Sequence, residues 1–93
     1  FQKLLAKDQR NALALNNAGN VYFLQERLDD ARQAYESALK AEPGDVGILV
    51  NLSRTLLRSG KKSEAKKRFL EAMGLDPRVS RRQSGLASEL GVK

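Results

Sequence analysis

Two stretches of the sequence repeat one pattern at a spacing of 34 residues. Residues 15–43 read LNNAGNVYFLQERLDDARQAYESALKAEP, and residues 49–77 read LVNLSRTLLRSGKKSEAKKRFLEAMGLDP. The two stretches share their small residues, one aromatic residue and a closing proline, and the matching pairs are Ala31 with Ala65, Tyr35 with Phe69, Ala38 with Ala72, and Pro43 with Pro77. A period of this length predicts stacked helical units.

Each copy has the residue pattern of a pair of helices. Apolar residues recur every three or four positions over residues 11–25, which is typical of an amphipathic helix. Asp29 stands where the N-cap of a second helix is expected, and Ser63 stands there one period later. Pro43 and Pro77 should end these second helices, because proline lacks an N–H and crowds the preceding turn.

Small residues mark the places where backbones should come close. Gly19, Ala31 and Ala38 are expected at contacts between helices, where a larger side chain would force the two helices apart. Gly60 suits the left-handed residue that ends a helix. The sequence therefore predicts an all-α fold with tightly packed helix pairs.

The pattern resembles the tetratricopeptide repeat family. The residues that carry the resemblance are Leu15, Gly19, Tyr22, Ala31, Tyr35, Ala38 and Pro43 in the first copy, and Leu49, Ser53, Leu56, Ala65, Phe69, Ala72 and Pro77 in the second. The second copy departs from the family pattern at Ser53 and Leu56. The resemblance implies an α-solenoid of stacked antiparallel helix pairs, whose concave side binds a peptide or protein segment.

The period also divides the whole chain, which we expect to be a single domain. The expected parts are the second helix of a truncated repeat (1–9), two full repeats (10–43 and 44–77) and a capping helix (78–93). Phe1 takes the aromatic position of the truncated repeat. Because a helix array needs a polar outer face at its end, the capping helix should bury only one apolar edge.

The resemblance implies that the first helix of each pair lines the concave groove. The expected peptide-binding residues there are Asn16, Asn17, Asn20, Phe23, Asn51, Arg54, Arg58 and Arg81. An amide side chain both donates and accepts, so it can pair with a peptide backbone. Asn17 and Asn51 are one period apart and are expected to form adjacent rungs. Arg54 and Arg58 lie one turn apart and offer guanidinium groups to an acidic group.

Some members of this family hold the C-terminal carboxylates of chaperone tails with a clamp of Lys, Asn, Asn, Lys and Arg. Asn20 and Asn51 match the two Asn of the clamp, and Arg81 stands at its second Lys. However, Asn16 replaces the first Lys and Gly85 replaces the final Arg. Because these two cations are absent, the sequence does not favour that ligand.

Composition excludes several classes of function. The 93 residues include no Cys, His or Trp, so a disulfide, a thiolate metal site and any His-based nucleophile or general base are excluded. No Gly-rich phosphate loop occurs, and the apolar runs, such as residues 48–50, are far too short to span a membrane. We therefore expect a non-catalytic module without a cofactor, metal or small-molecule substrate.

The formal net charge of +6 is unevenly distributed. Residues 1–45 contain 6 basic and 7 acidic residues, whereas residues 46–93 contain 11 basic and 4 acidic residues. An acidic partner should therefore dock at the C-terminal half. The alternatives are sequence-independent binding of nucleic acid through the cluster Lys61, Lys62, Lys66, Lys67 and Arg68, for which a solvated helix face is the preferred interpretation, and self-assembly through the N-terminal helix at residues 1–8.

Overall fold

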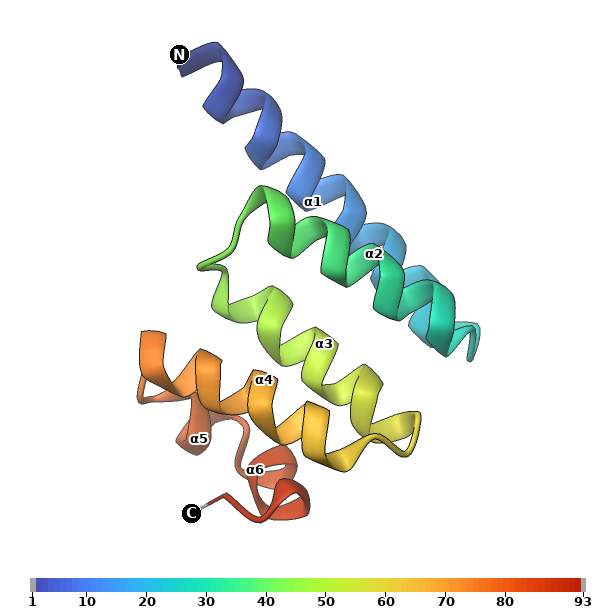
Figure 1. The fold of residues 1–93 in the computed structure, drawn as a ribbon, viewed down its shortest axis with the longest axis vertical. Helices are drawn as coiled ribbons and strands as arrows, with labels where there is room; N and C mark the ends of the chain where they lie inside the picture. The colour runs from blue at the N-terminus through green and yellow to red at the C-terminus, as the bar shows by residue number, and fades with distance from the viewer. Residues whose placement is uncertain (1, 93) are drawn as a thin grey trace.

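The first four helices form two hairpins that lie one on the other (Figure 1). The computed structural model describes the backbone of residues 2–92 and the side chains of residues 10–92. Helix α1 (Gln2–Leu24) pairs with α2 (Leu28–Ala41), and α3 (Val46–Arg58) pairs with α4 (Lys62–Leu75). Helix α2 also packs against α3, so the two pairs share one continuous core. The expected all-α solenoid of stacked antiparallel pairs is confirmed.

The core is built from the residues that the repeat has in common. Tyr35 and Phe69 are 2% and 0% exposed, and the repeated alanines, Ala31, Ala38, Ala65 and Ala72, are each 0% exposed. Burying a side chain as large as Phe69 contributes about 1.5–3 kcal/mol. A Cβ at Gly19 would lie 2.5 Å from the ring of Tyr35. The expected close approach at Gly19 is therefore present.

The turn inside each hairpin uses a left-handed residue, but the following helix starts earlier than expected. Gly60 has φ +81°, as expected, and Glu26, one period before it, has φ +61°. Helices α2 and α4 begin immediately after Arg27 and Lys61, neither of which caps through its side chain. Asp29 lies inside the first turn of α2, so the predicted N-cap there is wrong, and Ser63 lies inside α4 in the same way. The left-handed residue lies just before the point where the chain enters the helix. The dipole of α2 still favours the negative charge of Asp29 in its first turn.

Helix α1 runs through the predicted boundary between residues 9 and 10. It is a single helix of 23 residues, so the described part of the truncated repeat is continuous with the first helix of the next pair. The physical reason is visible in the sequence, because Gln9 occupies the position where the two full repeats have Pro43 and Pro77. The aromatic position assigned to Phe1 lies outside the described residues. None of the helices within residues 2–92 combines the length and the apolar character needed to cross a bilayer.

The C-terminal cap consists of two short helices, α5 (Val79–Arg82) and α6 (Ser84–Leu90), where one capping helix was expected. The chain leaves helical geometry at Gln83, with φ −113° and ψ 48°. Gly85 weakens helix formation just beyond this point by about 1 kcal/mol relative to Ala. The predicted apolar edge is nevertheless buried, because Val79 and Leu90 are 4% and 1% exposed.

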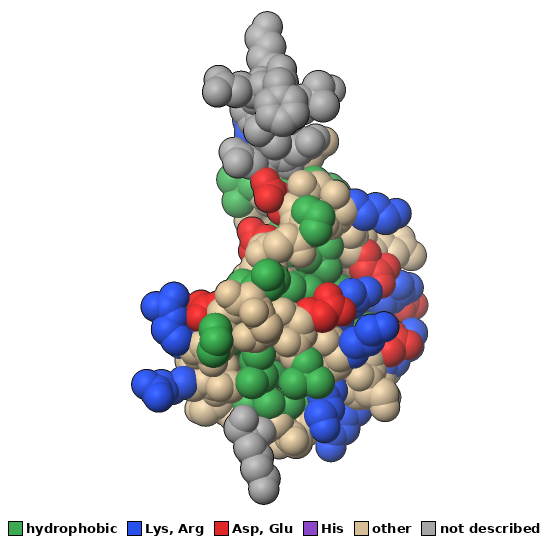
Figure 2. Space-filling model, turned by 60° about the vertical axis from the view of Figure 1, so that its left-hand side comes forward, with side chains coloured by type: hydrophobic (Ala, Val, Ile, Leu, Met, Phe, Trp, Pro, Cys, Tyr) green, Lys and Arg blue, Asp and Glu red, His purple; other side chains and the backbone are tan. Residues whose placement is uncertain are grey.

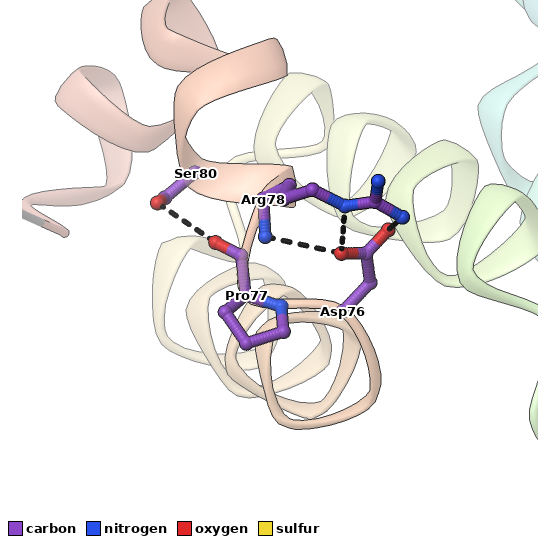
Figure 3. Close-up of polar contacts among 4 residues, drawn as sticks. All are labelled: Asp76, Pro77, Arg78 and Ser80. Atoms are coloured by element: carbon purple, nitrogen blue, oxygen red, sulfur yellow. Dashed lines mark hydrogen bonds and ion pairs between the residues drawn. The ribbon is translucent and has the colours of Figure 1, made fainter.

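A polar corner joins α4 to α5 (Figure 3). The backbone N–H of Arg78 donates to Oδ1 of Asp76 at 3.1 Å, and its guanidinium Nε donates to the same oxygen at 3.0 Å. Ser80 donates from its hydroxyl to the carbonyl of Pro77 at 3.4 Å. These contacts lie at the turn from which α5, with its two arginines, begins.

Candidate functional site

Two adjoining hollows lie between α3 and the C-terminal cap. The larger has a volume of about 700 Å³, and we call it the basic hollow; its lining consists of Arg54, Leu57, Arg58, Arg82, Gln83, Ser84, Gly85, Leu86 and Glu89. The smaller, of about 370 Å³, extends along α3 toward Val46 and Asn51. Arg54, Arg82 and Gln83 line both, so the two hollows adjoin each other along α3, and together we call them the depression along α3.

Three of the predicted asparagines meet across the two repeats. Nδ2 of Asn51 donates to Oδ1 of Asn16 at 3.0 Å and lies 3.5 Å from Oδ1 of Asn20. The hydroxyl of Tyr35 donates to the same oxygen of Asn20 at 2.5 Å. Asn51 also lines the smaller hollow. These contacts order the three amide groups beside the depression, and we call these residues the asparagine network.

Asn17 does not belong to this network. It is exposed, and Asn51 bonds to Asn16 and Asn20 instead. The expectation that Asn17 and Asn51 form adjacent rungs is therefore wrong. Residues 16 and 20 lie one turn apart on one face of α1, whereas residue 17 is turned about 100° away from residue 16. Equivalence in the repeat does not make two side chains neighbours.

Burial and charge act in opposite directions on Tyr35. Burial raises the pKa of the Tyr35 hydroxyl above its ordinary value, and the positive charge of Arg54 partly offsets this rise. The hydroxyl therefore stays protonated at neutral pH and can donate to Asn20. Tyr35, which fills the aromatic core position of the repeat, thus orients the amide group of Asn20.

The predicted arginines of α3 face the basic hollow, and both are engaged. Nη2 of Arg54 donates to Oε1 of Gln83 at 3.1 Å, which connects α3 to the break between α5 and α6. Nη2 of Arg58 lies 2.5 Å from Oε1 of Glu26. The guanidinium carbon of Arg58 also lies 5.5 Å from the ring centroid of Phe23, which is within cation–π range. Phe23 is thus half-buried beneath Arg58.

The cap contributes Arg82 to the hollow, and not the predicted Arg81. Both arginines are exposed, but Arg82 lines both hollows and Arg81 lines neither. The prediction assumed that α5 keeps the register of a first helix. Under that register Arg82 would fall on the core position of Ile48, one period earlier. Instead Val79 is buried and Arg82 is exposed, so α5 does not keep that register, and the repeat period could not identify Arg82.

The basic cluster of the sequence lies on α4 and at its N-cap residue, Lys61. Its lysines are exposed, and Nη1 of Arg68 pairs with Oε1 of Glu71 at 3.1 Å. Figure 2 shows Lys and Arg side chains at both flanks of the lower half of the face it presents, with hydrophobic side chains between them. Within the described part of the chain, no group of three or more acidic side chains is arranged to hold a metal ion.

Comparison with known proteins identifies relatives over nearly the whole chain. The type IV pilus assembly protein PilF of Pseudomonas aeruginosa is 32% identical over 95 residues, covering 97% of this chain and 35% of PilF. The TPR repeat-containing thioredoxin TTL4 of Arabidopsis thaliana is 30% identical over 83 residues, covering 89% of this chain and 12% of TTL4. The chain therefore spans about a third or less of these relatives.

A solved structure with the same fold contains a bound peptide. The first TPR of Spaghetti (RPAP3), bound to the HSP90 peptide SRMEEVD, matches with a TM-score of 0.77 and 25% sequence identity, covering 88% of this chain and 68% of that one. Two family profiles, both described as tetratricopeptide repeat, match residues 22–89 and residues 1–33. With the repeat visible in the sequence and the stacked helix pairs in the structure, these matches show that the chain belongs to the tetratricopeptide repeat family.

Proposed function

We propose that the chain is a non-catalytic binding module for an extended, acidic segment of a partner protein. The observation that carries the proposal is the depression along α3, which has the asparagine network at one part and arginines from two elements at the other. Tetratricopeptide repeats are generally protein-interaction modules without catalytic activity, and the matched RPAP3 domain is bound to a peptide. A peptide partner is therefore the class that fold and surface both support.

In this proposal the two parts of the site have different tasks. Asn51 and Asn20 contact the peptide backbone, because each amide has a donor and an acceptor and is already oriented by its neighbours. Arg54 and Arg82 attract carboxylates, since guanidinium groups form strong charge-assisted bonds with them. The depression is short, so the affinity should be on the order of micromolar.

The proposal is tested by adding an acidic peptide to ¹⁵N-labelled protein and following amide shifts. The peptide contains several Glu residues, and a second peptide has Gln in their place. Arg82→Gln should weaken the acidic peptide about threefold to tenfold and leave the Gln peptide unchanged. Lys66→Gln removes the same charge from the outer side of α4 and is the matched control. Shifts that avoid residues 16–24, 50–58 and 81–83 would contradict the proposal.

A second candidate function is self-association through the open side of α1. Ala14 is exposed and Val21 is 52% exposed, whereas their equivalents one period later, Ile48 and Thr55, are 2% and 0% exposed. Positions that are buried in the second repeat are therefore exposed in the first repeat. Sedimentation at increasing protein concentration tests this candidate, and Val21→Glu should abolish any dimer. A monomer at all concentrations would exclude it.

A further inference from the structure

The arginine at the end of α3 already holds a carboxylate of the same chain. Arg58 is paired with Glu26 across the two repeats, with 2.5 Å between Nη2 and Oε1. The side chains of Arg58 and Glu26 remain 52% and 63% exposed, so the pair is open to solvent. Arg58 also lines the basic hollow. An acidic group that enters the hollow therefore meets one arginine whose charge is already neutralised.

The turn that carries Glu26 does not itself require this residue. Glu26 has φ +61°, a left-handed conformation that costs less for glycine. The second repeat has Gly60 at the equivalent position, with φ +81°. The first repeat thus places a carboxylate where the backbone favours a residue without a side chain. That carboxylate reaches from the α1–α2 turn to the end of α3.

We propose that Glu26 is an internal competitor for the basic hollow. This inference rests on the proposed binding of an acidic segment. In the free protein the Glu26 carboxylate occupies Arg58, and a carboxylate of the bound partner replaces it while Glu26 turns into water. Among the residues whose side chains are described, Arg54 is bonded only to the neutral Gln83, so it receives a ligand without losing an ion pair to any of them. Glu26 thereby lowers the affinity of the site for acidic segments.

The test measures the affinity of the same two peptides by fluorescence anisotropy. Glu26→Gln should tighten the acidic peptide about twofold to fivefold, because an exposed ion pair no longer has to be broken. The Gln peptide should bind unchanged. Glu26→Gly removes the carboxylate and relaxes the backbone, and it should give the same gain. Glu71→Gln is the matched control, since Glu71 pairs with Arg68 on α4 and its loss changes the net charge equally.

A double mutant separates competition at Arg58 from a general effect of charge. In an Arg58→Met background, Glu26→Gln should no longer change the affinity. If wild-type protein binds the acidic peptide but Glu26→Gln gains no more than Glu71→Gln, the competitor role is wrong and the proposed function stands. A gain that persists in the Arg58→Met background also overturns the inference. If no variant binds the acidic peptide, the inference and the proposed function both fail.

Discussion

At the scale of single residues, Gly19 allows α1 and α2 to approach each other closely. Replacing it with alanine would place a methyl group 2.5 Å from the ring of Tyr35. Alanine favours a helix over glycine by about 1 kcal/mol, but overpacking costs about 1–3 kcal/mol. We therefore expect Gly19→Ala to lower the free energy of unfolding in urea by up to about 2 kcal/mol.

A second glycine in a helix provides the control for that measurement. A Cβ at Gly74, in α4, would meet no atom within 4 Å. Gly74→Ala should therefore be neutral or stabilise by up to about 1 kcal/mol. Equal effects of Gly19→Ala and Gly74→Ala would show that the contact with Tyr35 is not limiting.

Tyr35 should make the stability of the protein depend on alkaline pH. Because burial raises its pKa in the folded state, the unfolded chain loses this proton first as the pH rises. The contribution is fully present below about pH 10, the ordinary pKa of tyrosine, and is lost as pH rises through the folded pKa. Urea unfolding between pH 8 and pH 11 should show a shallower decline for Tyr35→Phe than for wild type. The same slope in both proteins would contradict this reasoning.

The candidate site shows how far individual residues can be predicted from sequence. Asn16, Asn20 and Asn51 were expected together beside the groove, because helical spacing defines a face, and the structure brings their three amide groups together. Their hydrogen bonds to one another could not be predicted, since these depend on the offset between two packed helices. Arg82 could not be found because the register of the repeat is lost in α5.

At the scale of secondary structure, the sequence predicts helices better than their ends. The periodic apolar residues and Pro43 correctly placed the hairpins. The starts of α2 and α4 were both missed, because each helix begins soon after a left-handed residue, Glu26 or Gly60, and neither helix has a side-chain N-cap that the sequence could show. The continuous α1 follows from Gln9, where a proline is missing. The positions at which helices start and end are therefore the least predictable feature of this fold.

The corner between α4 and α5 should respond to acid. Hydrogen bonds from the side chain and the backbone of Arg78 lower the pKa of the Asp76 carboxyl below its ordinary value of 3.8. A lowered folded pKa contributes stability that is present above the unfolded pKa and is lost as the pH falls through the folded pKa. Side-chain ¹³C NMR should therefore show Asp76 titrating below pH 3.8 in wild type. In Arg78→Gln its pKa should rise toward 3.8, and an unchanged titration would show that Arg78 is not the cause.

At the scale of the whole molecule, charge changes sign along the array. Residues 1–45 have a net charge of −1, from 6 basic and 7 acidic residues, and residues 46–93 have +7, from 11 basic and 4 acidic residues. The structure places Arg54, Arg58 and Arg82 around one hollow, so part of this excess is concentrated at a single site. The lysines of α4 are exposed and do not line this hollow. The protein therefore carries a net positive charge, and this charge is concentrated toward the C-terminal half of the stacked helices.

This uneven distribution of charge predicts how an acidic segment lies on the surface. A peptide with Glu residues at one end only should place that end at the basic hollow and its neutral end near the asparagine network. A spin label on the acidic end should broaden the amide signals of residues 82–86 most strongly, and a label on the neutral end those of residues 16–20. Raising the salt from about 50 to 300 mM should weaken binding, because exposed charges are screened within about 10 Å or less.

The peptide with the reversed residue order supplies the control for this orientation. Its acidic residues are the same in number but lie at the other terminus, so the broadening patterns of an N-terminal and a C-terminal label should exchange. If charge only attracts the peptide and the asparagine network sets its direction, the patterns follow the direction of the backbone and do not exchange. That result would show that the amide groups of Asn16, Asn20 and Asn51, and not the arginines, set the orientation of the bound peptide.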